Sequence, residues 1–68
     1  MTLGEAIRQE RQKRKWTQKD VVNKCDKEVS ISYLSELERG VKTNPSAKVL
    51  SKLSLALKLN IDYFCKYL

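Results

Sequence analysis

Apolar residues along this chain recur at the spacing of a helix, and capping residues separate the apolar stretches at short intervals. No stretch alternates apolar and polar residues in the way of a half-buried strand. Thr2 and Glu5 form a capping box, in which each side chain binds the other residue's backbone amide, and they predict a helix up to about Lys15. The pattern as a whole predicts an all-α chain of about five short helices.

A second helix is expected after a second capping box, formed by Thr17 and Asp20. Trp16 precedes this cap and is expected to pack on Val21 as a hydrophobic staple. The side chains that this helix is expected to carry inward are Val21, Val22 and Cys25.

A third helix, two turns long, is expected to begin after the cap Ser30 and to stop at Gly40. Leu34 and Leu37 define its buried stripe. At about 100° per residue, the opposite side carries Ile31, Ser32, Ser35, Glu36 and Arg39. Because the second and third helices are short, adjacent and joined by a few residues, they have the layout of a helix-turn-helix.

The fourth and fifth helices complete the predicted domain. Asn44 and Pro45 are expected to supply the cap and the first helical residue of the fourth helix, and Asn60 the cap of the fifth. The apolar stripe of the fourth helix is Val49, Leu50, Leu53, Ala56 and Leu57. The stripe of the fifth helix is Ile61, Phe64, Cys65 and Leu68.

A length of 68 residues allows one small domain, expected to span residues 1–68. Cys25 and Cys65 both lie on apolar stripes, so they are expected to be free and buried, with a disulfide between them as the minor alternative. The chain has no histidine, and two cysteines do not make a zinc site. No metal and no cofactor are therefore expected.

The chain carries 14 Lys and Arg against 8 Asp and Glu, a formal net charge of +6. Such an excess favours a polyanionic partner, although a solvated basic surface gives the same composition. The start of the chain has no apolar run of signal-peptide length, and charges recur too often for a membrane span. We therefore expect a cytoplasmic protein without a membrane partner.

Several motifs together resemble one family of DNA-binding domains. They are the arginine-rich first helix with Arg11, WTQKDVV at 16–22, SYLSELERG at 32–40, NPS at 44–46, and the leucine-rich fourth helix ending near LNIDYF at 59–64. Each motif is weak alone, but the set is similar to the Cro and phage-repressor type of helix-turn-helix, the lambda-repressor-like family. This resemblance covers nearly the whole chain.

The resemblance implies a compact five-helix domain that binds double-stranded DNA, usually as a homodimer on a two-fold operator, and regulates transcription. It implies base contacts from Ile31, Ser32, Ser35 and Glu36. Gln18 matches the family's phosphate- or base-contacting glutamine at the start of the second helix, and it is expected on the DNA backbone. Arg39, and more loosely Lys42, Thr43 and Asn44, match positions that hold the DNA backbone. The side of the third helix opposite its buried stripe is called the reading face below. Tyr33 borders both the buried stripe and this reading face, so a phosphate contact by Tyr33 remains open.

The two glutamates of the third helix are expected to have different roles. Glu38 lies about 40° from Leu34 around the helix and matches the family glutamate that pairs with the first-helix arginine, here Arg11. Glu36 lies within the reading face, where phosphates repel a carboxylate unless it accepts a hydrogen bond, most naturally from the cytosine amino group. We expect Glu38 to be structural and Glu36 to select a base, with Ile31 suited to a thymine methyl group.

The chain departs from the family pattern at three places. Between Thr17 and Gly40 it is two residues longer than the commonest spacing and lacks the usual glycine in the turn, so residues 26–28 either bulge or extend the second helix. Lys58 stands where the family often has glycine, and a left-handed cap there costs on the order of 1 kcal/mol. Leu55 lies off the apolar stripe of the fourth helix.

An exposed apolar patch of Leu55, Tyr63 and Tyr67 is the expected dimer interface. The leading hypothesis is a small repressor or controller protein. The alternative is a protein-interaction module, such as an antitoxin or antirepressor. An enzyme is not expected, because without histidine a nucleophile–base pair would need Cys25 or Cys65, both expected to face inward. No small-molecule ligand is indicated.

Overall fold

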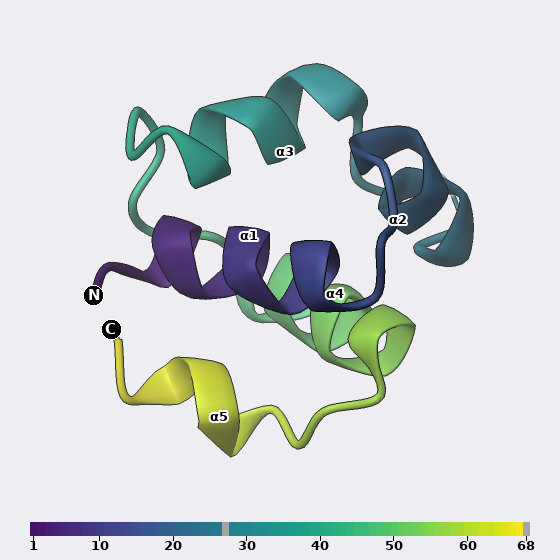
Figure 1. Ribbon diagram of the computed structural model, residues 1–68. Coiled ribbons are helices and arrows are strands. Elements are labelled where there is room, and N and C mark those ends of the chain that lie inside the picture. The colour runs from purple at the N-terminus through teal and green to yellow at the C-terminus, as the bar shows by residue number, and fades with distance from the viewer. Residues whose placement is uncertain (27, 68) are drawn as a thin grey trace.

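A computed structural model describes residues 1–26 and 28–67 of the chain, and this part is all-helical, as predicted. The helices are α1 (Leu3–Lys13), α2 (Gln18–Lys24), α3 (Ile31–Glu38), α4 (Ala47–Leu57) and α5 (Asp62–Cys65). α3 and α5 lie on opposite sides of the molecule, with α1 and α4 between them (Figure 1). α5, which buries Phe64 in the core, therefore lies away from α3.

The helix starts follow the capping residues, with one correction. The capping boxes of α1 and α2 and the Ser30 cap of α3 are present as predicted. The expected start of α4 at Asn44 and Pro45 is wrong, because α4 begins after Ser46, whose hydroxyl accepts from the amide of Val49 at 3.2 Å. A serine in extended conformation satisfies that free amide two residues later than the sequence pattern indicated.

Four helices are followed, within two residues of their last residue, by a residue in the left-handed conformation: Lys15 (φ 58°), Asp26 (φ 55°), Gly40 (φ 81°) and Lys58 (φ 57°). α1 ends at Lys13, two residues earlier than predicted, because Lys15 already has left-handed φ and Trp16 donates to the Arg11 carbonyl at 3.2 Å. The left-handed cap at Lys58 does form, and the amide of Leu59 donates to the Ser54 carbonyl at 2.8 Å. Three of the four helix ends thus use a residue other than glycine.

The last helix differs most from the sequence pattern. Asn60 accepts from the amide of Asp62 at 3.0 Å, but the residue at the cap position is Ile61, which makes no side-chain cap bond. Cys65 is exposed rather than buried, because α5 is only one turn long and turns Phe64 alone into the core. Cys25 is buried and both cysteines are free. Leu68, the last residue of the predicted stripe, lies outside the described residues.

All five helices contribute to one apolar core, with Ile7, Val21, Leu34, Leu53 and Phe64 as its most buried large side chains from successive helices. α1 and α3 are in close backbone contact at Gly4, where a Cβ atom would overlap the Leu37 carbonyl oxygen. Glycine is therefore required there for α3 to pack on α1. In the described part of the chain, no helix has the length and apolar character that crossing a membrane requires.

Candidate nucleic-acid interface

The outward face of α3 carries the small and polar side chains that the sequence places there. Leu34 and Leu37 are buried beneath the helix, while Ile31 on the other side is 46% exposed. Ser32 and Arg39 are exposed as well, and Ser35 and Glu36 are half-buried. An exposed helix face with small side chains at its centre can approach base edges in a groove without obstruction.

The turn between α2 and α3 does not extend α2, which ends at Lys24. Asp26 adopts the left-handed conformation, which aspartate tolerates better than most residues, and thereby takes the place of the missing glycine. Two ion pairs link this turn to α4, Lys48 to Glu28 at 3.2 Å and Lys52 to Asp26 at 3.6 Å. Lys52 is half-buried but its partner and both members of the other pair are exposed, so the two pairs add little stability. Residue 27 of the lengthened turn lies outside the described residues.

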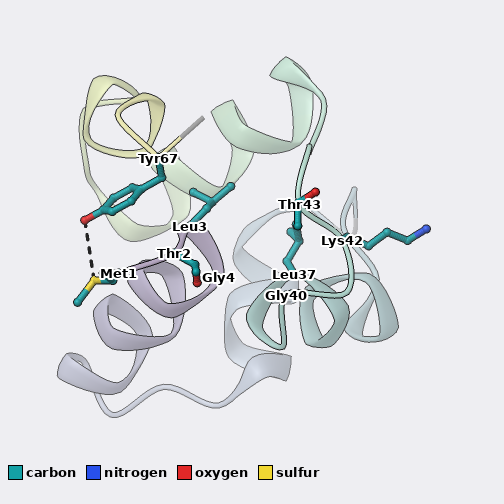
Figure 2. A pocket seen from close by; sticks show the side chains of 9 residues that line it. All are labelled: Met1, Thr2, Leu3, Gly4, Leu37, Gly40, Lys42, Thr43 and Tyr67. Carbon is teal, nitrogen blue, oxygen red and sulfur yellow. Dashed lines mark hydrogen bonds between the residues drawn. The ribbon is translucent and has the colours of Figure 1, made fainter.

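The loop after α3 folds back onto the end of that helix. Gly40 is left-handed, and the amides of Val41 and Lys42 both donate to the Glu36 carbonyl, at 2.9 and 3.2 Å. This cap leaves Lys42, Thr43 and Asn44 exposed beside α3. A groove of about 390 Å³ separates the loop from the start of α1, and the Lys42 ammonium points away from its Met1–Tyr67 side (Figure 2).

A buried ion pair fixes α3 against α1. The Arg11 guanidinium donates from Nε to Glu38 Oε2 and from Nη2 to Glu38 Oε1, both at 2.9 Å. Its Nη1 donates to the Trp16 carbonyl, also at 2.9 Å, so the same arginine holds the connection into α2. The Glu38 and Arg11 side chains are 4% and 13% exposed. The carboxylate raises the pKa of Arg11 above its ordinary value, chiefly through these hydrogen bonds.

Gln18, the first residue of α2, is half-buried and donates from Nε2 to Glu38 Oε1 at 3.3 Å. The structure thus joins Gln18 to the Arg11–Glu38 pair, a contact that the sequence reasoning did not include. Tyr33 is half-buried and packs against the apolar core. Its side chain therefore has a packing role, and its contact with a DNA phosphate stays a prediction.

A second buried glutamate was missed by the sequence reasoning. Glu10 accepts from Arg14 Nη1 at 3.0 Å, from Lys13 Nζ at 3.2 Å and from the Tyr63 hydroxyl at 2.8 Å. Arg14 also donates to the Leu57 carbonyl at the end of α4, at 2.6 Å. The spacing of Glu10 to Lys13 and Arg14 was a signal for local pairs. Nothing in the sequence pattern indicated Tyr63, which is 53 residues away.

The electrostatics of the Glu10 cluster follow from these contacts. Burial alone would raise the pKa of Glu10, but hydrogen bonds from Arg14, Tyr63 and Lys13 outweigh it, so this pKa lies below its ordinary value. The same carboxylate raises the pKa of Tyr63. The folded chain therefore favours an ionised Glu10 and a protonated Tyr63 hydroxyl.

The residues expected at a dimer interface have different environments. Leu55 is 71% exposed. Tyr63 and Tyr67 are half-buried and pack against the core, and the Tyr67 hydroxyl lies 3.8 Å from the Met1 sulfur (Figure 2). Leu55 is thus the most exposed of the three side chains expected at the interface.

Comparisons with known proteins agree with this geometry. A helix-turn-helix family model matches residues 7–64. The HTH-type transcriptional regulator SinR of Bacillus subtilis (strain 168) is 34% identical over 59 residues, which cover 87% of this chain and 51% of SinR. The SinR protein of Bacillus licheniformis has the same identity and coverage.

The HTH-type transcriptional regulator SlrR of Bacillus subtilis (strain 168) is 54% identical over 33 residues, 48% of this chain and 22% of SlrR. The chain spans about half the length of the SinR proteins that it matches. No solved structure gives a significant match. The family model covers most of the helical domain, and the chain therefore belongs to the lambda-repressor-like helix-turn-helix family.

Proposed function

We propose that this protein is a sequence-specific DNA-binding transcriptional regulator in which α3 enters the major groove. The observation that carries the proposal is the exposed face of α3, with Ile31, Ser32, Ser35 and Glu36 at its surface. The net charge of +6 favours a polyanionic partner. The similarity to SinR and SlrR, both named transcriptional regulators, supports the same function.

Base selection falls to Glu36 and Ile31. A carboxylate accepts a hydrogen bond from the amino group of cytosine, and an isoleucine side chain packs on the methyl group of thymine. Phosphates repel Glu36 at every sequence, so the helix gives up non-specific attraction in exchange for discrimination. Ser32 and Ser35 approach the bases between them.

The sugar–phosphate backbone is held on both sides of α3. Arg39 at the end of the helix supplies a cation, and the exposed loop of Lys42, Thr43 and Asn44 lies beside it. Gln18 contacts DNA from the start of α2. These contacts set the register of α3 on the duplex, whereas its central side chains read the bases.

The proposed cooperative unit is a homodimer on a two-fold operator, with two copies of α3 about 34 Å apart, one turn of DNA. Leu55 is the exposed apolar side chain that a second copy would cover. Such a dimer represses by occupying the site that polymerase or a rival protein needs. Sedimentation that detects only monomer at high concentration, both free and on DNA, contradicts this part of the proposal.

The decisive experiment is selection of bound duplexes from a random pool, which reports both DNA binding and the half-site. Affinity for the selected duplex is then measured against salt, with an expected log–log slope of about −0.9 per phosphate neutralised. Arg39→Ala is expected to weaken binding to every sequence and to flatten the slope. The matched control is Lys66→Ala, because the Lys66 ammonium lies over the rings of Tyr63 and Tyr67. Lys66 directly follows α5, which lies on the opposite side of the molecule from α3 (Figure 1).

Two outcomes contradict the proposal. If the pool yields no enriched sequence and mixed duplexes bind without salt dependence, a protein-interaction module explains the domain better. If Arg39→Ala leaves the slope unchanged, the backbone contact has been assigned to the wrong residue.

A further inference from the structure

The carboxylate of Glu38 is the meeting point of three helices. Its Oε1 accepts from Arg11 Nη2 of α1 at 2.9 Å and from Gln18 Nε2 of α2 at 3.3 Å, and Glu38 itself belongs to α3. Its Oε2 accepts from Arg11 Nε at 2.9 Å. Stability explains the arginine contacts, since a buried carboxylate needs a cation. It does not explain why the first side chain of α2 is drawn into the same site.

The chemistry of the acceptor determines which way the Gln18 amide faces. An ionised carboxylate has only acceptor oxygens, whereas an amide has a donor end and an acceptor end. If the Gln18 amide were turned around, its carbonyl oxygen would face a buried anion and the two would repel each other. Glu38 therefore holds the amino group of Gln18 inward in one of two otherwise similar orientations.

We propose that Glu38 is a positioning residue for DNA binding: its carboxylate holds the Gln18 amide in the one orientation that contacts DNA. The inference rests on the proposed function and deepens it. The amino group keeps a second hydrogen, and the carbonyl oxygen keeps its lone pairs, so both remain for a partner outside the fold. Because Glu38 belongs to α3, placement of the reading helix and presentation of Gln18 occur together.

The proposal distinguishes two roles that a single substitution would confuse. If Glu38 only stabilises the fold, removing it leaves the contribution of Gln18 to DNA affinity unchanged in molecules that remain folded. If Glu38 positions the amide, that contribution falls when the carboxylate is gone, because the amide is then free to turn around. A double-mutant cycle in DNA affinity separates the two roles, since it measures the coupling between the two side chains.

The cycle uses the full chain and the duplex selected from the random pool, at a temperature below the melting transition of every variant. Gln18→Ala is expected to weaken binding about tenfold in the wild-type background, the loss of one charge-assisted hydrogen bond. In the Glu38→Gln background the same substitution is expected to weaken binding about twofold or less, because a neutral amide in place of the carboxylate can pair with either orientation of the Gln18 amide. Equal losses in both backgrounds overturn the inference.

The matched control is Gln9→Ala, an exposed glutamine of α1 that lies about 160° around the helix from Arg11. Its substitution is expected to leave affinity unchanged in both backgrounds. The salt slope gives a second check, because a neutral amide releases no counterion: Gln18→Ala keeps the wild-type slope, unlike Arg39→Ala.

A measurement on the unmodified chain guards against a Glu38 variant that fails to fold. In the free protein, the side-chain amide protons of Gln18 are expected to exchange with water several-fold more slowly than those of exposed Gln9 and Gln12. Equally fast exchange overturns the inference without any variant. A wild-type chain that binds no duplex overturns the proposed function as well, whereas DNA binding with equal losses overturns this inference alone.

Discussion

Two buried glutamates, Glu38 and Glu10, join α1 to helices on opposite sides of the molecule. Glu38 lies between α1 and α3, where it ties α3 and the start of α2 to Arg11. Glu10 lies between α1 and α5, where it binds Arg14 and Tyr63. α1 is thus a central support, with the proposed DNA-binding helix on one side and the closing helix on the other (Figure 1).

The two glutamates differ in how much of their binding is local. Arg11 and Glu38 are separated by 27 residues and form a two-bond pair in which both side chains are almost wholly buried. Two of the partners of Glu10, Lys13 and Arg14, lie within four residues of it along the chain, and Lys13 is 64% exposed. The side-chain contacts of Glu38 therefore all join different helices, whereas Glu10 combines two local ion pairs with one long-range hydrogen bond from Tyr63.

The largest effect is expected from Glu38→Gln. It leaves the Arg11 guanidinium buried without a counter-charge, a loss of about 3 to 5 kcal/mol from the free energy of unfolding. This is a large share of the 5 to 15 kcal/mol or so that holds a typical domain. Denaturant titration and the melting temperature measure it. The preferred base at each operator position is expected to stay the same.

A double substitution provides the control for this prediction. Replacing Arg11 by Met and Glu38 by Leu removes both charges, so no buried ion is left uncompensated. The double variant is expected to be more stable than Glu38→Gln alone. If it is less stable, loss of packing rather than the unpaired charge explains the single variant.

Glu10→Gln is expected to have a smaller effect, about 1 to 2 kcal/mol of unfolding free energy. The Tyr63 hydroxyl keeps an acceptor, and Lys13 can return to water. DNA affinity at a temperature below the transition is expected to be unchanged, because Glu10 binds Tyr63 of α5, which lies on the opposite side of the molecule from α3 (Figure 1). A variant that folds well but loses affinity contradicts the separation of the two sides.

The pH dependence of stability gives a second test of the role of Glu10. The pKa of Glu10 is lower in the folded chain than its ordinary value near 4.5, so its ionised form adds stability above that pH. The contribution is lost as the pH falls through the lower, folded pKa. The difference in stability between wild type and Glu10→Gln is therefore expected to shrink below pH 4.5. A difference that grows in acid would contradict a lowered pKa of Glu10 in the folded chain.

Lys58→Gly is expected to raise the free energy of unfolding, through the end of α4 that Arg14 contacts. Lys58 follows Leu57, whose carbonyl accepts from Arg14, and it has left-handed φ of 57°. Replacing it with glycine removes the steric cost of that conformation, a net gain of about 1 kcal/mol measured by denaturant titration. Gly40→Ala is the reverse control, because Gly40 is left-handed and an added Cβ atom there would meet no other atom within 4 Å. It is expected to destabilise the fold by a similar amount, through backbone strain alone.

The smallest effect on stability is expected from Glu36→Gln, on the same helix as Glu38. Glu36 is half-buried, and no described side chain bonds to its carboxylate, so the melting temperature is expected to be nearly unchanged. Base preference at one operator position is expected to relax by about 1 to 3 kcal/mol, while non-specific binding tightens. Early melting with intact base preference would mean that the roles of Glu36 and Glu38 are exchanged.

The sequence by itself determined the helical class and most helix starts. Capping boxes at Thr2 and Thr17 and the serine at 30 act through neighbouring amides, and an apolar stripe depends only on helical periodicity. It also placed Leu34 and Leu37 inward and Ile31 outward, since three residues on one helix keep their relative directions in any fold. These features are local, so no distant residue is needed to infer them.

Only the tertiary structure decided which distant side chains meet. The contacts of Tyr63 with Glu10 and of Gln18 with Glu38 join residues 53 and 20 positions apart, and no helical period relates them. The position of Cys65 depended on how α5 docks, and one turn was too short for its apolar pattern to determine which side chains are buried. Long-range pairing follows from the packing of whole helices, because each helix brings all its side chains into place together.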